Sequence, residues 1–373
     1  MVSAATPPPP RGVRVGRVAG VPVLVSPSWL LFAGVVVVSF GPLLSDRYGT
    51  GRGYSGAGAF AVLLLLSVLL HEVGHCVVAR AFGLPVRSIT VTFLAGLTEI
   101  TEPPQTPARE YAVAVVGPTV SLLLAGVGWA GRDLFEPQSL PFLLMTVVAA
   151  SNALVAAFNL LPGLPLDGGR VLRSVLWRVT GDPGRATRTA AWAGRVVALV
   201  VVPVLLLGVL PAVGLGDVSF GTVLFSALVA TFVYAGASAV LQQEQLEQRL
   251  PRASVAALAR PAVAVTEDLP LAEAVRRAQA ADARGVVVVD TSGRPRAVVS
   301  EAAVLATPEE RRPWVPVGSV ARALADGMVL DAALVGAPLL EALRRTPASE
   351  YVVVDAGALR VLVAADVAAV LAP

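Results

Sequence analysis

The chain of 373 residues contains one cysteine, two histidines and no lysine, and only 15% of its residues are charged. The single cysteine, Cys76, excludes an internal disulfide and a metal site built from several cysteines. Arginine carries all the basic charge, and the net charge is only +3. A nucleic-acid-binding surface needs a clustered basic face, so we expect no nucleic acid partner.

Apolar residues are abundant, at 55% of the chain, whereas a soluble domain has about 45–50%. Six apolar stretches are candidates to cross a bilayer, which takes about 20 residues. They lie at roughly Ser28–Leu44, Ala57–Phe82, Arg109–Gly131, Leu140–Leu161, Ala190–Leu210 and Ser219–Val240. We therefore predict a multi-span α-helical membrane protein of about six transmembrane helices, with the lipid bilayer as its surroundings.

The arginines flanking these stretches indicate the orientation of the spans. One side of the predicted membrane would carry most of them, and the other side only Arg47, Arg52 and Arg132. By the positive-inside rule the N-terminus is cytoplasmic, and six spans return the C-terminus to the same side. We expect a multi-pass protein of the cell membrane.

Four segments are expected along the chain. Residues 1–12 predict a disordered tail, residues 13–241 the membrane part, residues 242–252 a linker and residues 253–373 a soluble domain. Inside the membrane part, Arg87–Ile100 alternates polar and apolar side chains, which predicts a membrane-associated β-hairpin. Such a hairpin is tolerated at membrane depth only where protein covers its edges.

The soluble domain contains two similar copies, at about 253–306 and 316–373. Each copy predicts the order helix, strand, turn, strand, helix. This pattern resembles a tandem pair of CBS domains, an α/β module. The fold class expected for the whole chain is thus a helical membrane part followed by an α/β tandem CBS pair.

His71, Glu72 and His75 form the motif H-E-x-x-H inside the second predicted span. Positions four apart share one face of a helix, so both imidazoles can bind one Zn²⁺ while Glu72 accepts a proton from an activated water. The alternative is a chance match between two buried histidines satisfied by neighbouring helices. Because these are the only histidines and ionisable groups inside a span are costly, the motif favours a metal site.

A hydrolytic zinc has three protein ligands and an open position. The chain has no third histidine, and Cys76 is rotated off the face that His71 and His75 share, which suits an apolar filler better than a ligand. We therefore expect a carboxylate. Asp167 follows prolines that break the fourth span and precedes two glycines that permit a turn. The alternative for Asp167 is an exposed residue in an ordinary cytoplasmic turn.

Together, H-E-x-x-H and the later N-x-x-P-x-x-P-L-D-G-G-R resemble the site-2 protease family of intramembrane zinc metallopeptidases. The resemblance extends over Gly20–Val240. It implies one zinc ion per chain held by His71, His75 and Asp167. It also implies that Glu72 is the general base and that Asn159 lies near the metal to hold the substrate backbone.

Two positions depart from the family pattern. Ser121 stands where the family has asparagine, and Ala95 stands where it has the first of two glycines. We expect neither residue to touch a zinc ligand. Their expected effects are on a local helix contact and on substrate docking.

The family resemblance implies a zinc metalloendopeptidase that cleaves in or near a transmembrane segment of a membrane-anchored signalling protein. The implied partner is an anti-sigma factor or a membrane-held transcription regulator, cut at the cytoplasmic side in regulated intramembrane proteolysis. The alternative is a CBS-regulated transporter or channel in which the histidines and Glu72 relay protons. Stoichiometric zinc distinguishes the two.

The CBS resemblance implies a regulatory domain, a route to homodimers and an adenine nucleotide as ligand. The nucleotide candidates are Ser300 and Asp366. Each copy keeps only half of the usual pattern, a serine or threonine followed three residues later by aspartate. A dimerisation or tethering module without a nucleotide fits this sequence equally well.

Overall fold

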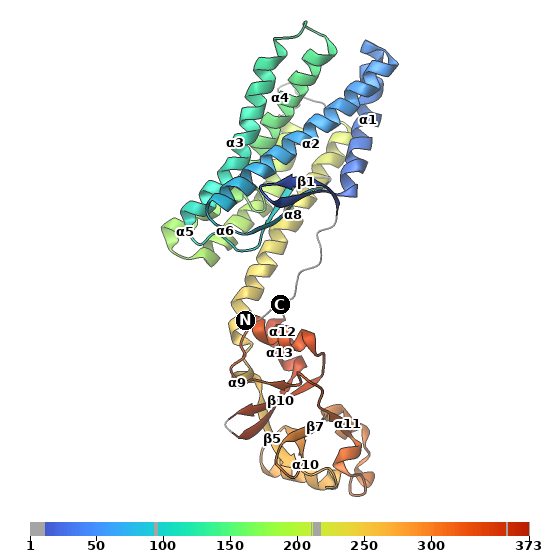
Figure 1. Cartoon of the computed structure of the whole chain (residues 1–373), viewed down its shortest axis with the longest axis vertical. Coiled ribbons are helices and arrows are strands. Elements are labelled where there is room, and N and C mark those ends of the chain that lie inside the picture. Colours follow the sequence, from blue (N-terminus) through green and yellow to red (C-terminus); the bar gives the residue numbers. More distant parts are fainter. Residues whose placement is uncertain (1–11, 93–95, 210, 212–217, 356, 373) are drawn as a thin grey trace. The chain divides into compact units, whose positions relative to one another are not determined.

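The computed structural model describes residues 12–92, 96–209, 211, 218–355 and 357–372, in two compact units, Met1–Leu241 and Gln242–Pro373 (Figure 1). Among the described residues, six helices are long and apolar enough to cross a membrane, which confirms the predicted membrane fold. The helices of the first unit are α1 (Pro27–Tyr48), α2 (Thr50–Ala81), α3 (Pro107–Arg132), α4 (Leu140–Asn159), α5 (Asp167–Thr180), α6 (Pro183–Val196, continued by π-helical turns at Val197–Val201 and Val204–Val209) and α8 (Phe220–Arg249).

Three of the spans begin with a hydroxyl cap and a proline. The side chains of Ser26, Thr106 and Ser139 accept hydrogen bonds from the first turns of α1, α3 and α4, and each helix has proline at its first or second position. The cap satisfies a backbone donor that the helix leaves free, and proline fits there because its missing N–H is not needed. These local signals fix where the spans start.

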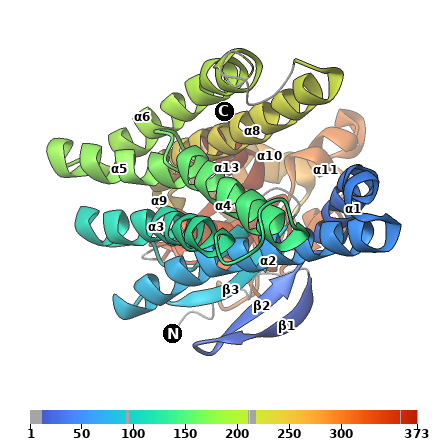
Figure 2. The same cartoon turned by 90° about the horizontal axis from the view of Figure 1, so that it is seen from above.

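The predicted hairpin is present as β3 (Val86–Val91) and β4 (Gly96–Ile100), but it belongs to a larger sheet. Strands β1 (Val13–Val18) and β2 (Val21–Val25) extend it in the order β1-β2-β3-β4, with β2 and β3 parallel. The sheet packs against α2 (Figure 2). In the described chain β4 pairs with no strand other than β3, so it is an edge strand.

Cys76 lies between α2 and this sheet. It is fully buried and packs with Val21, Val23 and Ile89. The structure therefore shows the cysteine as an apolar packing residue, as predicted. Strand β2 covers the edge of β3, and α2 covers a face of the hairpin, while the outer edge of β4 stays unpaired in the described chain.

Gly168 and Gly169, which follow Asp167, were expected to permit a turn, and that expectation is wrong. Both glycines lie inside the first turn of α5. A Cβ on Gly168 would collide with the backbone of Leu160, and one on Gly169 with that of Gly163. The glycines thus permit close packing of α5 on the loop that precedes it, rather than a turn.

The second unit contains the predicted pair of α/β copies. Its elements are α9 (Val255–Leu258), β5 (Arg260–Val265), α10 (Leu271–Ala280), β6 (Gly285–Val289), β7 (Pro295–Val299), α11 (Glu301–Ala306), β8 (Ala321–Ala323), β9 (Val329–Leu330), α12 (Ala337–Arg345), β10 (Glu350–Asp355), β11 (Ala358–Val363) and α13 (Ala364–Leu371). The strand order is β8-β7-β6-β5-β11-β10-β9.

The first strand of each copy, β5 and β8, was not predicted from the sequence. Each of them pairs with a strand of the other copy. In the first copy β5 pairs with β6 of its own copy and with β11 of the second. In the second copy β9 pairs with its own β10, while β8 pairs with β7 of the first. Each copy therefore completes the sheet of the other. The segment 242–252, expected as a linker, continues α8 to Arg249 and ends in a short 3-10 turn.

Candidate active site

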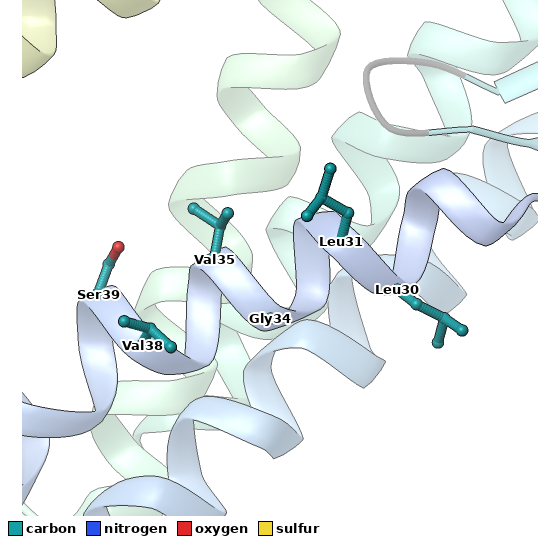
Figure 3. A pocket seen from close by; sticks show the side chains of 6 residues that line it. All are labelled: Leu30, Leu31, Gly34, Val35, Val38 and Ser39. Atoms are coloured by element: carbon teal, nitrogen blue, oxygen red, sulfur yellow. The ribbon is translucent and has the colours of Figure 1, made fainter.

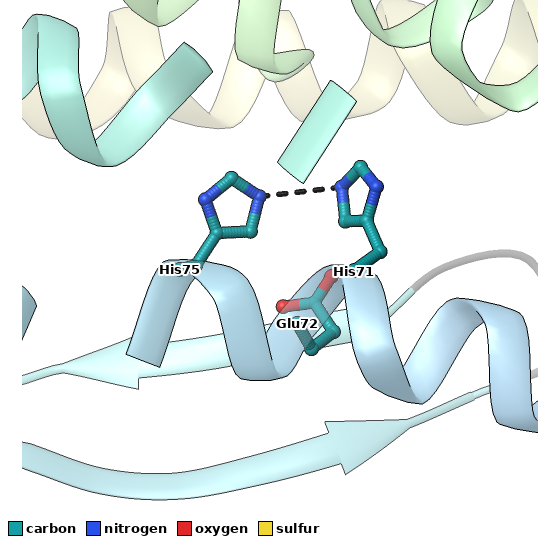
Figure 4. A group of neighbouring side chains, drawn as sticks. All are labelled: His71, Glu72 and His75. Carbon is teal, nitrogen blue, oxygen red and sulfur yellow. Dashed lines mark hydrogen bonds between the residues drawn. The ribbon is translucent and has the colours of Figure 1, made fainter. Parts of the chain in front are cut away.

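His71 and His75 project from one side of α2, as predicted for positions four apart (Figure 4). Their side chains are about 5% exposed, and their Nε2 atoms lie 3.2 Å apart. With α2 spanning 32 residues, or about 48 Å, this pair lies in the last third of the helix.

Asp167, the first residue of α5, completes the cluster from a distant part of the chain. Its Oδ2 lies 3.1 Å from Nε2 of His71 and 3.2 Å from Nε2 of His75. The three atoms form a nearly equilateral triangle. Three ligands of a tetrahedral zinc, with bonds of about 2.0–2.1 Å, lie about 3.3 Å apart. The triangle fits that donor set.

The tautomer of His75 supports a cation at this point. Its Nδ1 lies 2.6 Å from the carbonyl oxygen of Val113 on α3, and since a carbonyl only accepts, Nδ1 carries the proton and donates it. In the neutral ring Nε2 then presents a lone pair to the Asp167 carboxylate. The lone pairs of His75 Nε2 and Asp167 Oδ2, 3.2 Å apart, repel each other unless a cation or a proton lies between the two atoms.

Ser121 touches a predicted zinc ligand, contrary to our expectation. Its Oγ lies 2.9 Å from Nδ1 of His71, inside the protein core. A protonated Nδ1 donates to this hydroxyl and leaves Nε2 free to bind a metal. The departure from asparagine therefore falls on a residue that orients a ligand.

Val113, Gly117 and Ser121 follow one another at intervals of four, so they line one face of α3. A Cβ on Gly117 would collide with Nε2 of both histidines, so the space in front of the imidazoles has room only for glycine. The spacing of Gly117 and Ser121 in an apolar span was the sequence signal that could have revealed this supporting face.

Glu72 lies on the side of α2 that faces the sheet (Figure 4). Thr98 on β4 donates a hydrogen bond of 2.7 Å from Oγ1 to Oε2 of Glu72. A Cβ on Gly96 would overlap the Glu72 side chain, so β4 lies directly on this carboxylate. Ala95, the other departure in the hairpin, is outside the described residues. Thr98 was not predicted, because nothing in the sequence marks its partner.

Asn159 is the last residue of α4 and is half-buried. Among the described residues no hydrogen bond joins it to the histidines or Asp167, so its catalytic role stays a prediction. A different asparagine connects α4 to α2. Asn152 donates from Nδ2 to Oγ of Ser67 over 3.0 Å, and Ser67 lies one helical turn before His71.

The nucleotide candidates in the second unit are both engaged in local contacts. Ser300 caps α11, and its Oγ accepts from the backbone N–H of Ala303 over 3.1 Å. Asp366 forms an ion pair of 2.7 Å with Arg260 from the other copy. A nucleotide would have to displace or share these partners, and its binding stays a prediction.

A separate hollow lies on the outer face of α1 (Figure 3). Its lining residues are Leu30, Leu31, Gly34, Val35, Val38 and Ser39. None of them is ionisable, and none belongs to the histidine–aspartate cluster. This hollow therefore offers apolar surface rather than chemistry.

The family model described as Peptidase family M50 matches residues 59–137 and 136–203, a region that contains both histidines, Glu72, the supporting face of α3 and Asp167. The match to the M50 model thus coincides with the elements that build the site.

Curated proteins and a solved structure are also similar to this chain. Two curated proteins named "Putative zinc metalloprotease" are similar: sll0528 of Synechocystis, 35% identical over 64% of this chain and 62% of its own length, and Rip3 of Mycobacterium tuberculosis, 37% identical over 60% and 57%. The chain spans about three fifths of these relatives. A solved structure, "Site-2 Protease from Methanocaldococcus jannaschii", has 26% identity and a TM-score of 0.44, covering 61% of this chain and 93% of that chain.

Proposed function

We propose that the chain is an intramembrane zinc metalloendopeptidase that hydrolyses a peptide bond in or near a transmembrane segment. The observation that carries the proposal is the triangle of His71 Nε2, His75 Nε2 and Asp167 Oδ2, with sides of 3.1–3.2 Å, beside the carboxylate of Glu72. The match of residues 59–203 to the M50 family model and the names of the similar proteins support the same activity.

The proposed reaction divides the work among the residues of the site. Bound by His71, His75 and Asp167, zinc would supply a Lewis acid that activates water and polarises the scissile carbonyl. Glu72 accepts the proton of the attacking water and delivers it to the leaving amine. Thr98 holds one oxygen of Glu72, so the other remains available for the proton. Asn159 is proposed to hold the substrate backbone.

The edge strand β4 is the proposed place where substrate binds. A helical peptide bond is closed to attack because its carbonyl is hydrogen-bonded along the helix, so the substrate must unwind near the site. An unwound segment can add to β4 as a further strand, since β4 lacks a second strand partner in the described sheet and lies on Glu72.

We further propose that the active-site end of α2 faces the cytoplasm and that cleavage releases a cytosolic fragment of a signalling protein. Arg80 closes the end of α2 nearest the motif, consistent with a cytoplasmic surface. In this scheme the CBS pair regulates the protease, through homodimerisation or an adenine nucleotide. An anti-sigma factor or a membrane-held transcription regulator is the proposed substrate class.

Reconstitution tests the proposed activity. The purified chain and a candidate membrane substrate are placed in the same vesicles, with wild type and Glu72→Gln compared at equal zinc content. We expect zinc-dependent cleavage by the wild type and its loss in the variant. Cleavage that persists in Glu72→Gln would refute the mechanism. Proton flux that survives removal of zinc by a chelator would instead support the transporter alternative.

A further inference from the structure

A partly buried ion pair outside the ligand cluster connects the helices that carry the site. Glu110, in the first turn of α3, has a side chain only 3% exposed and pairs with the guanidinium of Arg173 on α5, whose side chain is 20% exposed. Nε of Arg173 also donates to Oγ1 of Thr187 on α6 over 2.7 Å. One guanidinium thus contacts side chains from two other helices.

These helices are the ones whose relative position decides the metal geometry. On α3, Glu110 lies one turn before Val113, whose carbonyl orients His75. On α5, Arg173 lies less than two turns after Asp167. On α6, one turn after Thr187, the carbonyl of Ala190 accepts a hydrogen bond of 3.0 Å from the N–H of Leu164, in the loop that leads to Asp167.

Stability alone does not explain such a pair. Removing two charges from water is costly, and apolar residues of the same size usually stabilise a core as well or better. What an ion pair adds is a fixed direction, because the carboxylate and the guanidinium satisfy each other in few relative positions of their helices. The pair joins α3, which supports the histidines, to α5, which carries Asp167. It therefore fixes the position of one helix relative to the other.

We propose that Glu110 and Arg173 are positioning residues that hold Asp167 within ligand distance of His71 and His75. This inference rests on the proposed function, since it assumes that the three residues bind zinc. The pair touches neither the metal ligands nor Glu72, so it acts through the helices. Thr187 contributes by fixing α6 and, with it, the loop before Asp167.

The test measures zinc affinity of the full-length chain in detergent by competition with a chelator, and the visible absorption of the cobalt(II)-loaded protein. The variants are Glu110→Gln, Arg173→Met and the double apolar variant Glu110→Met/Arg173→Met. The matched control is Arg185→Gln, which breaks the exposed Arg185–Asp182 pair at the α5–α6 turn and leaves the capping carboxylate of Asp182 in place.

We expect each single variant to bind zinc about 10-fold more weakly and to change the cobalt spectrum. This is the low end of the loss caused by removing a direct partner of a metal ligand, because the pair acts on the ligands only through the helices. The double variant should melt at or above the temperature of the singles but keep the weakened affinity. Arg185→Gln should match wild type. Wild-type zinc affinity and cobalt spectra in folded variants, with only a lowered melting temperature, would overturn the inference. A wild-type chain that binds no zinc would refute the proposed function instead.

Discussion

At the scale of single residues, the site depends on how closely α3 approaches two imidazoles. Gly117 lies at that approach, and a Cβ there would meet both Nε2 atoms. Gly126 lies further along the same helix, where a Cβ would meet nothing within 4 Å. Alanine at Gly117 and alanine at Gly126 change helix propensity alike, but only the first would collide with the imidazoles. Comparing the two variants therefore isolates the steric effect on the metal site.

We predict that Gly117→Ala lowers zinc binding by at least about 10-fold, because its methyl group displaces the imidazoles, a change comparable to losing a supporting contact. Gly126→Ala should bind zinc like wild type. Isothermal titration or chelator competition measures both. Equal zinc affinity in the two variants would show that the space in front of the histidines is not the metal site.

Ser121 gives a second prediction at this scale. Ser121→Ala removes the acceptor for Nδ1 of His71 and should weaken zinc binding by about 10-fold or more. Ser121→Asn restores an acceptor in the form that the family uses, so it should keep more affinity than alanine. The order wild type, asparagine, alanine in a zinc titration is the expected result, and alanine binding as well as serine would contradict it.

At the scale of elements, the site sits between a helix and the free edge of a sheet. Glu72 contacts β4 and the histidines contact α3, yet ligand atoms of Glu72, His71 and His75 lie within 4.8 Å of one another, so the proposed substrate edge adjoins the metal site. The opposite edge of the same sheet is β1. Among the described residues no hydrogen bond joins β1 to the site residues, so β1 can serve as the control for substitutions in β4.

Proline introduced into β4 at Leu97 should abolish cleavage of a reconstituted substrate while leaving zinc bound, because proline disrupts the pairing of β4 with β3 and so the strand to which substrate would add. Proline at Val15 in β1 should leave cleavage unchanged. Leu97 and Val15 are both exposed, at 60% and 58%. Undiminished cleavage by the Leu97→Pro chain would rule out strand addition at this edge.

The elements also show which parts of the structure the sequence could predict. The helical spacing of His71 and His75, the apolar runs and the alternation in β3 are local signals, and the structure confirms the elements they predict. Asp167 was found because the donor set lacked a third ligand. The contacts of Ser121, Thr98 and Glu110 were missed. Each of these residues has its partner on another element, and no local sequence pattern indicates such a contact.

At the scale of the whole molecule, the second unit is a single folding unit despite its two copies. Its largest apolar core combines Val287 and Val298 of the first copy with Tyr351 and Leu362 of the second. The strand exchange between copies adds backbone pairing to that shared core. The sequence repeat predicted a tandem pair of domains, but the pairing of β5 with β11 and of β8 with β7 was missed, because the partner strand lies in the other copy.

We predict that residues 242–373 unfold in one cooperative transition, whereas residues 242–315 alone show none, because the first copy then lacks both β8 and β11. Circular dichroism melts of the two fragments, expressed without the membrane part, give this comparison. A stable, cooperative melt of the single copy would show that the strand exchange is dispensable.

The zinc content of the chain decides whether His71, His75 and Asp167 hold one metal ion in its membrane part. It is measured by metal analysis of the purified full-length protein, as wild type and as Asp167→Ala. We predict one zinc per chain for the wild type and a loss of most of that zinc in the variant, at equal helical content by circular dichroism. A wild type without zinc, or an Asp167→Ala chain that retains one zinc with wild-type affinity, would contradict the account.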